Sequence, residues 1–127
     1  MKYGYTRKNT ASFEDVVTKT KEALQDEGFG ILTEIDVQAT LKKKLDVDFD
    51  HYLILGACNP PFAYQALQAE QEVGLLLPCN VIVYEKNGEC FVSTMLPTVA
   101  MRVVDNDALA EIAKQVEIKL IRAIDNV

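Results

Sequence analysis

Cysteine and histidine are scarce in this 127-residue chain, which has three cysteines and one histidine. The three cysteines form no Cys-x-x-Cys pair, the spacing typical of thioredoxin-like redox proteins and of many structural zinc sites. Such a small, odd number also differs from the dense pairing of secreted disulfide scaffolds, which indicates a reducing compartment. The N-terminal segment has no apolar core of signal-peptide length. We therefore expect a cytoplasmic protein.

Long apolar runs and phosphate-binding glycine loops are also missing. The longest apolar stretches, at 52–58 and 73–79, are too short to cross a bilayer, so we expect no membrane insertion. Neither "GFG" at 28–30 nor "VGLLLP" at 73–78 matches the glycine patterns of nucleotide-binding loops. Positive charge is scarce too, because 13 basic and 19 acidic residues give a net charge of −6. That sign disfavours a polyanion, and we expect no nucleic-acid partner.

The composition is that of an ordinary globular protein, with 49% hydrophobic and 25% charged residues. A chain of this length can bury most of its apolar surface without disulfide bonds. We expect one domain spanning residues 1–127.

Alternating and helical periodicities along the chain predict the element order β-α-β-α-β-α-β-β-α. The predicted strands cover 2–8, 29–37, 51–58 and two hairpin arms within 79–96, and the predicted helices begin near Ser12, Asp36, Pro60 and either Asp105 or Asp107. The apolar run at 51–58 is typical of a strand in the centre of a sheet. The pattern predicts an α+β fold, or α/β two-layer fold, with one mixed sheet of about five strands and flanking helices.

Two similar loops carry the residues best suited to catalysis or metal binding. In "LGACNPPF" at 55–62, Cys58 and Asn59 lie between an apolar strand and a predicted helix, and "LLPCNV" at 76–81 contains a second Cys-Asn pair. The N-terminus of a helix beside Cys58 favours a thiolate, the reactive form of cysteine. A purely structural role has equal weight for Cys58 and Cys79, because unpaired cysteines often pack as small hydrophobic residues. For Cys90, in the hairpin, the structural role is favoured.

Other catalytic arrangements have less support. A Ser-His-Asp triad would have to combine His51 with Ser12 or Ser93, and neither serine lies in a nucleophile-elbow pattern. Glu34 and Asp36 share one face of a predicted strand, where carboxylates usually face solvent. We expect no catalysis at either place.

The segments "HYLILGACNPPFAYQAL" and "EVGLLLPCNVIVYEKNGECFVSTMLPTVAM" resemble the domain of unknown function 302 family, over nearly the whole chain. The resemblance implies a compact α/β fold with a mixed sheet, a homodimer, and no assigned activity. The loop motifs of related members are matched here by Gly56, Cys58, Asn59 and Pro60, and by Leu77, Pro78, Cys79 and Asn80. Another branch of the family looks like Phe-Gly-Asn-Pro and Leu-Pro-Leu at these loops. The fold therefore does not require the cysteines, which favours a functional role for them.

The leading hypothesis is a homodimeric binding domain whose pocket, between the two loops, takes a small ligand or a soft metal ion such as zinc. The expected ligand-binding residues are Gly56, Cys58, Asn59, Pro60, Pro78, Cys79 and Asn80. A zinc ion bound to Cys58 and Cys79 would need water or a partner chain to complete its coordination. Two alternatives stay open. One is a thiol-dependent redox or sulfur-handling enzyme in which Cys58 attacks and Cys79 resolves, and the other is a protein-interaction module.

We expect binding rather than catalysis, and we expect a homodimer because the last helix has more apolar positions than one buried stripe needs: Leu109, Ile112, Val116 and Leu120, and separately Ile118 and Ile121. Its buried stripe is complete without Ile118 and Ile121, which lie at different helical positions. These two side chains are therefore available to contact a second copy.

Overall fold

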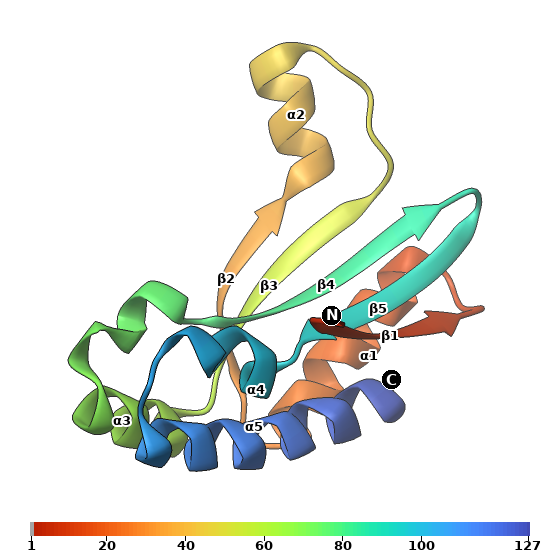
Figure 1. Cartoon of the computed structure of the whole chain (residues 1–127). Coiled ribbons are helices and arrows are strands. Elements are labelled where there is room, and N and C mark those ends of the chain that lie inside the picture. Colours follow the sequence, from red (N-terminus) through yellow and green to blue (C-terminus); the bar gives the residue numbers. More distant parts are fainter. Residues whose placement is uncertain (1) are drawn as a thin grey trace.

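The computed structural model describes residues 2–127 and contains one five-stranded sheet with helices packed beside it (Figure 1). The strands are β1 (Gly4–Asn9), β2 (Gly30–Asp36), β3 (Tyr52–Cys58), β4 (Cys79–Lys86) and β5 (Glu89–Met95). The α-helices are α1 (Phe13–Asp26), α2 (Val37–Leu45), α3 (Pro60–Ala69), α4 (Pro97–Ala100) and α5 (Asp107–Asp125). Two 3-10 helices, η1 (Gln71–Leu76) and η2 (Met101–Val103), complete the described chain. The α+β class and the predicted order of the main elements are confirmed.

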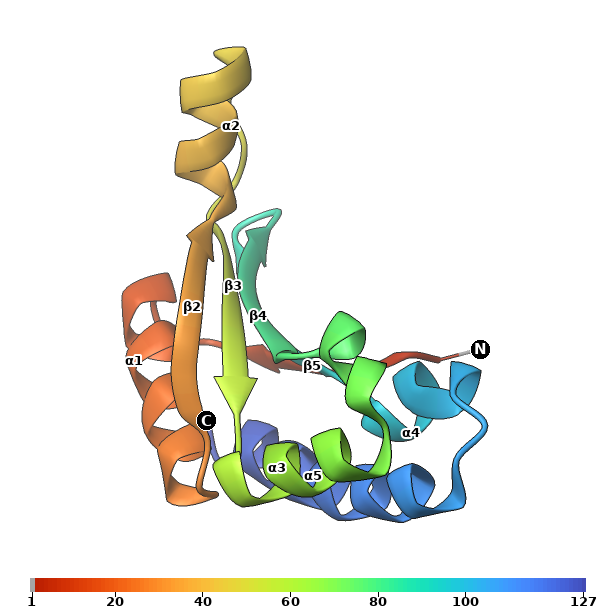
Figure 2. The same ribbon diagram turned by 90° about the vertical axis from the view of Figure 1, so that its left-hand side faces the viewer.

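The sheet has the strand order β1-β5-β4-β3-β2, and each neighbouring pair is antiparallel. The prediction of a mixed sheet is therefore wrong. A parallel pair needs a connection that crosses back over the sheet, whereas α2 leaves one end of the sheet and the chain returns beside β2 in the opposite direction (Figure 2). The middle strand is β4, and β3 lies next to it.

Side-chain caps mark the starts of α1, α2 and α5. The Asp36 carboxylate accepts a hydrogen bond from the backbone N–H of Ala39 at 2.9 Å, which confirms the predicted start of α2. The cap of α5 is Asn106, whose side-chain oxygen accepts from the backbone N–H of Leu109 at 3.0 Å. The predicted Asp105 or Asp107 cap is therefore wrong. Asparagine and aspartate are nearly equivalent caps, so composition does not separate neighbouring positions.

The predicted hairpin is confirmed between β4 and β5. Asn87 and Gly88 both have positive φ, 54° and 78°, as a tight two-residue turn between antiparallel strands requires. Their turn sets the register in which Lys86 faces Glu89 and Val81 faces Thr94.

The main core lies between α1, α5 and one face of the sheet. Its fully buried members include Val16, Leu24, Leu55, Val81, Val83 and Leu120. Because side chains alternate along a strand, the opposite face carries the residues between these, among them Tyr52, Tyr84 and Phe91. The aromatic rings on that face are stacked, with centroids 5.5 Å apart for Tyr52 and Tyr84 and 5.2 Å apart for Tyr84 and Phe91.

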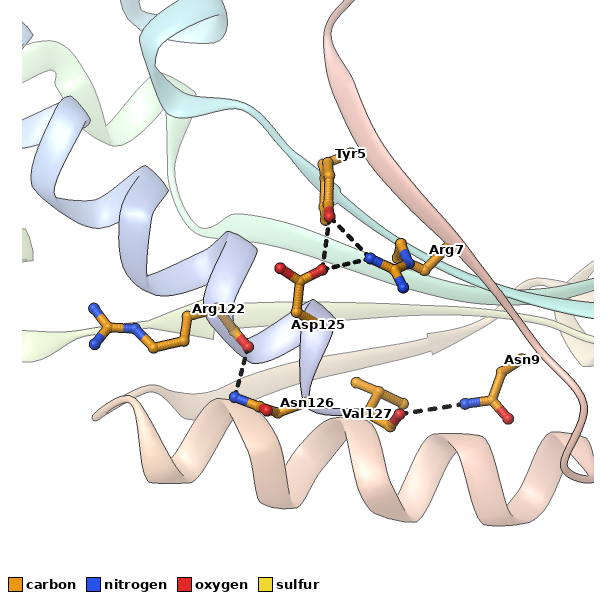
Figure 3. Close-up of polar contacts among 7 residues, drawn as sticks. All are labelled: Tyr5, Arg7, Asn9, Arg122, Asp125, Asn126 and Val127. Atoms are coloured by element: carbon orange, nitrogen blue, oxygen red, sulfur yellow. Dashed lines mark hydrogen bonds and ion pairs between the residues drawn. The ribbon is translucent and has the colours of Figure 1, made fainter.

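The end of α5 is tied to β1 by polar side chains (Figure 3). The Tyr5 hydroxyl donates to Asp125 at 2.6 Å, and Arg7 pairs with the same carboxylate at 3.0 Å. Asn9 donates to the backbone oxygen of Val127 at 3.5 Å. The two contacts of Asp125 are exposed, so they orient the helix and contribute little to the free energy of unfolding.

The segment 36–51 forms an arm that extends away from the sheet (Figures 1 and 2). Its helix α2 buries no residue. Leu45 is 66% exposed and Phe49 is 47% exposed. The arm therefore lacks the packing that usually stabilises a helix. An isolated helix of this length is marginal in water. None of the helices in residues 2–127 combines the length and apolar character needed to span a bilayer.

Candidate functional site

A pocket of about 300 Å³ lies where α3 and α5 meet the adjoining ends of β3 and β4. Its lining includes Phe29, Leu32, Ala57, Cys58, Asn59, Phe62, Ala63, Ala66, Leu77, Pro78, Cys79, Met101, Ile112 and Ala113. Among the described residues that line it, Asn59 alone has an amide side chain and none is charged. The pocket therefore suits an apolar molecule.

Strand pairing brings the two cysteine loops to this pocket. Ala57 on β3 faces Cys79 on β4, so the end of one strand lies beside the start of the other. Cys58 follows Ala57 directly, and both cysteines line the pocket. Cys58, Cys79 and Cys90 are all free thiols.

Three of the seven predicted ligand-binding residues lie outside the lining. Gly56 packs against Thr33 and Pro78. Pro60 and Asn80 are exposed. Asn80 lies between Cys79 and Val81, which are both buried, so alternation along β4 turns its side chain away from the core. The four predicted residues that line the pocket are Cys58, Asn59, Pro78 and Cys79.

The thiol of Cys79 is buried, and burial raises its pKa from 9.0 to about 11, with a smaller contribution from the nearby Cys58. A buried thiol resists ionisation because the apolar surroundings do not solvate the thiolate. Cys79 is therefore neutral near pH 7, a form that is a poor nucleophile and a poor metal ligand.

Cys58 is half-buried beside the start of α3. The first two residues of that helix are Pro60 and Pro61, which have no backbone N–H. A helix N-terminus attracts a thiolate through its free N–H groups, and two of these are missing here. The start of α3 therefore offers two fewer N–H groups than an ordinary helix N-terminus.

A complete zinc site does not fit the described residues. Residues 2–127 contain no cluster of three or more histidine, cysteine, aspartate or glutamate side chains able to hold a metal ion. His51 lies at the far end of β3 from Cys58, where its ring stacks on Phe13 with centroids 4.7 Å apart. One chain thus offers at most the thiols of Cys58 and Cys79.

The other candidate groups have structural roles. Cys90 is buried in the main core, where burial is the larger cause of its raised pKa. Ser12 caps α1 through its bond from Asp15, and the Ser93 hydroxyl shares a hydrogen bond with Thr6 at 2.7 Å. None of these side chains lines the pocket.

The helical wall of the pocket was not identified from the sequence. Ala63 and Ala66 on α3 and Ala113 on α5 line it, and their small side chains leave space between the two helices. Alanines are also ordinary helix formers, so their presence gives no signal until the helices are seen to pack together.

The raised pKa of Cys79 predicts a pH-dependent stability. The folded pKa of about 11 exceeds the ordinary 9.0, so this stabilisation is complete below pH 9 and is lost as the pH rises through 11. We expect the wild type to lose about 2 kcal/mol of unfolding free energy between pH 8 and 11 that Cys79→Ala does not lose. Urea unfolding of both proteins at each pH measures this, because the two proteins differ in one titrating group. Parallel pH curves would contradict the prediction.

The comparisons with known proteins agree with this architecture. The sequence model of the family described as "Domain of unknown function DUF302" matches residues 5–127. The "Crystal structure of uncharacterized conserved protein DUF302 from Bacillus stearothermophilus" is 31% identical, with a TM-score of 0.93, and the match covers 99% of this chain and 98% of that chain. None of the curated proteins matches the sequence. The chain therefore belongs to the DUF302 family.

Proposed function

We propose that this protein is a homodimeric domain that binds a small apolar molecule in the pocket at the cysteine loops. The pocket itself carries the proposal, because about 300 Å³ is within the size range of small-molecule sites and its lining is apolar. Its walls include residues of the sheet, α3 and α5. Binding is favoured over thiol catalysis because Cys79 is held as a neutral thiol.

Filling the pocket should weaken the binding of an apolar probe. Ala63 lines the pocket and is half-buried, so phenylalanine there extends into the cavity without a change in the main core. We expect Ala63→Phe to bind toluene at least tenfold more weakly than the wild type. Chemical-shift changes of the labelled protein during a toluene titration measure the affinity and show which residues respond.

The matched control is Ala110→Phe, an exposed alanine on α5 that does not line this pocket. Its toluene affinity should equal that of the wild type. Equal binding by Ala63→Phe, or shift changes confined to residues outside the lining, would contradict the proposed site.

The homodimer is best supported by the arm and the open face of the sheet. The exposed and half-buried apolar residues there include Leu45, Val47, Phe49, Tyr52, Tyr84 and Phe91. Both surfaces lie on the same chain, so a two-fold axis lets each arm cover the open face of the other copy. On α5, by contrast, Ile118 is 60% exposed and Ile121 is half-buried, which leaves a smaller apolar surface.

A further inference from the structure

The pocket lies lengthwise between two helices, and this shape narrows the class of its ligand. We infer that the pocket holds the unbranched alkyl chain of an amphiphile, such as a fatty alcohol, acid or ester, whose polar end stays in solvent. The inference rests on the proposed function of the pocket and adds the chemical class of what it binds.

The wall formed by α5 gives the pocket its length. Four residues of this helix line the pocket at spacings of three and four positions, which is one helix face: Leu109, Ile112, Ala113 and Val116. At about 1.5 Å per residue, this row extends for about 10 Å along the helix. On α3 the lining residues lie between Phe62 and Leu67, over about 7 Å. An elongated molecule can therefore contact both walls along their whole length.

The two helical walls pack side by side (Figure 2). The side chain of Asn106, which caps α5, donates at 2.9 Å to the backbone oxygen of Ala69 at the end of α3. Ala63 and Ala66 on α3 and Ala113 on α5 all line the pocket, and their short side chains leave the space between the helices open. The pocket therefore follows the line along which the two helices face each other.

The pocket has a buried side and an open side. On the buried side, Met101, Leu109 and Ala113 belong to a cluster of core residues. On the open side, Leu32 is 66% exposed and Leu67 is 43% exposed. An alkyl chain can thus lie against the buried side while the end of the molecule reaches solvent at the open side.

Leu32 lies at an irregularity in β2. The register of β2 against β3 shifts between Ile31 and Thr33, so Leu32 has no partner on β3. Irregularities of this kind change the direction of a side chain from the one that strict alternation gives. An alkyl chain in the pocket would cover part of the exposed surface of Leu32, and the removal of apolar surface from water favours binding.

The lining offers no partner for the polar end of a ligand. Its exposed surface is almost wholly apolar, and none of the described lining residues is charged. The Asn59 side-chain N–H donates to the backbone oxygen of Glu27 at 3.2 Å, and the Cys79 thiol is buried and neutral. A polar group placed in such surroundings without a hydrogen-bond partner is unfavourable. The chain alone therefore fills the pocket.

The volume of the pocket favours a molecule longer than a single ring. A dry cavity of about 150 Å³ lined by apolar side chains binds benzene. At about 300 Å³ this pocket is twice as large, so one ring leaves part of it unfilled. A longer chain makes more contacts with the same walls, and each buried methylene group adds to the affinity.

The test is a titration of the complete, unaltered protein with toluene, the linear alcohols butanol, hexanol and octanol, and cyclooctanol, followed by chemical-shift changes of the lining residues. Each added methylene group should strengthen binding about fourfold along the linear series. Linear octanol should bind about tenfold more tightly than cyclooctanol, whose equal number of carbon atoms forms a compact ring that leaves part of the pocket unfilled. An affinity that does not rise with chain length, or equal binding of the two octanols, would overturn the inference.

A second measurement locates the polar end. Octyl glucoside, titrated below its micelle concentration, has the same chain and a sugar whose hydroxyl groups have no partner in the lining. Because the chain contacts are the same, its affinity should lie within about threefold of that of linear octanol. Loss of binding would show that the polar end has to enter the pocket, which contradicts the inference.

The variant Ala63→Phe assigns the binding to this pocket, because it should weaken the binding of linear octanol about tenfold. Ala110→Phe, which lies outside the lining, should bind octanol as the wild type does. If Ala63→Phe does not fold, the ligand series in the unaltered protein still decides. Toluene binding without a rise along the alcohol series refutes the alkyl chain while the proposed function stands, and failure of toluene and all the alcohols to bind refutes both.

Discussion

Gly56→Ala is expected to lower the free energy of unfolding by about 3 kcal/mol, the upper part of the range for overpacking a filled site. A Cβ at this position would overlap the side-chain oxygen of Thr33 and lie 2.8 Å from Cγ of Pro78. Thr33 belongs to the neighbouring strand β2, and Pro78 precedes β4. The added methyl group therefore meets the side chains of two neighbouring segments, one of them a proline ring. Urea unfolding monitored by circular dichroism measures the loss.

Two further variants separate this steric conflict from the general effect of replacing glycine. Gly74→Ala lies in η1 with nothing within 4 Å of the added Cβ, so its stability should change by less than about 1 kcal/mol. Thr33→Ala removes the overlapping oxygen, and in that background Gly56→Ala should cost measurably less. An equal cost of Gly56→Ala in both backgrounds would show that the Thr33 contact is not the cause.

The same position shows what the sequence reveals about the site and what it does not. Gly56 belongs to the Gly-x-Cys-Asn-Pro motif, so we expected it to contact the ligand. In the structure it packs between neighbouring strands, and the motif combines this packing position with the pocket residues Cys58 and Asn59. A motif identifies which residues belong together, but only the three-dimensional contacts separate packing from binding.

Features with local causes were predicted best. The turn at Asn87 and Gly88 and the Asp36 cap depend on residues close together in the chain, and both are confirmed. The antiparallel pairing of β2 with β3 depends on where the chain goes between the strands, which periodicity does not report. The space between α3 and α5 likewise arises from two helices that are distant in sequence, so their alanines did not predict a pocket.

The two proposed surfaces lie at opposite ends of β3. Tyr52 begins the strand next to the arm, and Cys58 ends it at the pocket. No residue of the arm, 36–51, lines the pocket. Substitutions on the arm should therefore leave the pocket and its affinity for toluene unchanged, which makes toluene binding a useful measure of correct folding in arm variants.

The double variant Leu45→Asp, Phe49→Asp is expected to convert the dimer into a monomer. In one chain Leu45 is 66% exposed and Phe49 is 47% exposed, and neither belongs to the buried core, so aspartate there should cost the isolated fold little. In the proposed dimer the same positions are buried against the sheet of the other copy, where an unpaired carboxylate is unfavourable. We expect the dissociation constant of the dimer to rise at least hundredfold, as for the loss of two central apolar contacts.

Light scattering at micromolar concentration distinguishes the outcomes, because the chain mass is 14.2 kDa and a dimer has twice that mass. The matched control is Leu75→Asp, which places the same charge on a residue that is 85% exposed in η1, away from the arm. It should keep the mass of the wild type. A monomeric wild type would refute the dimer itself, whereas a double variant that stays dimeric and still binds toluene would move the interface to another surface. Because two-fold symmetry places each substitution in the interface twice, a dimer that tolerates four added carboxylates cannot be built on the arms.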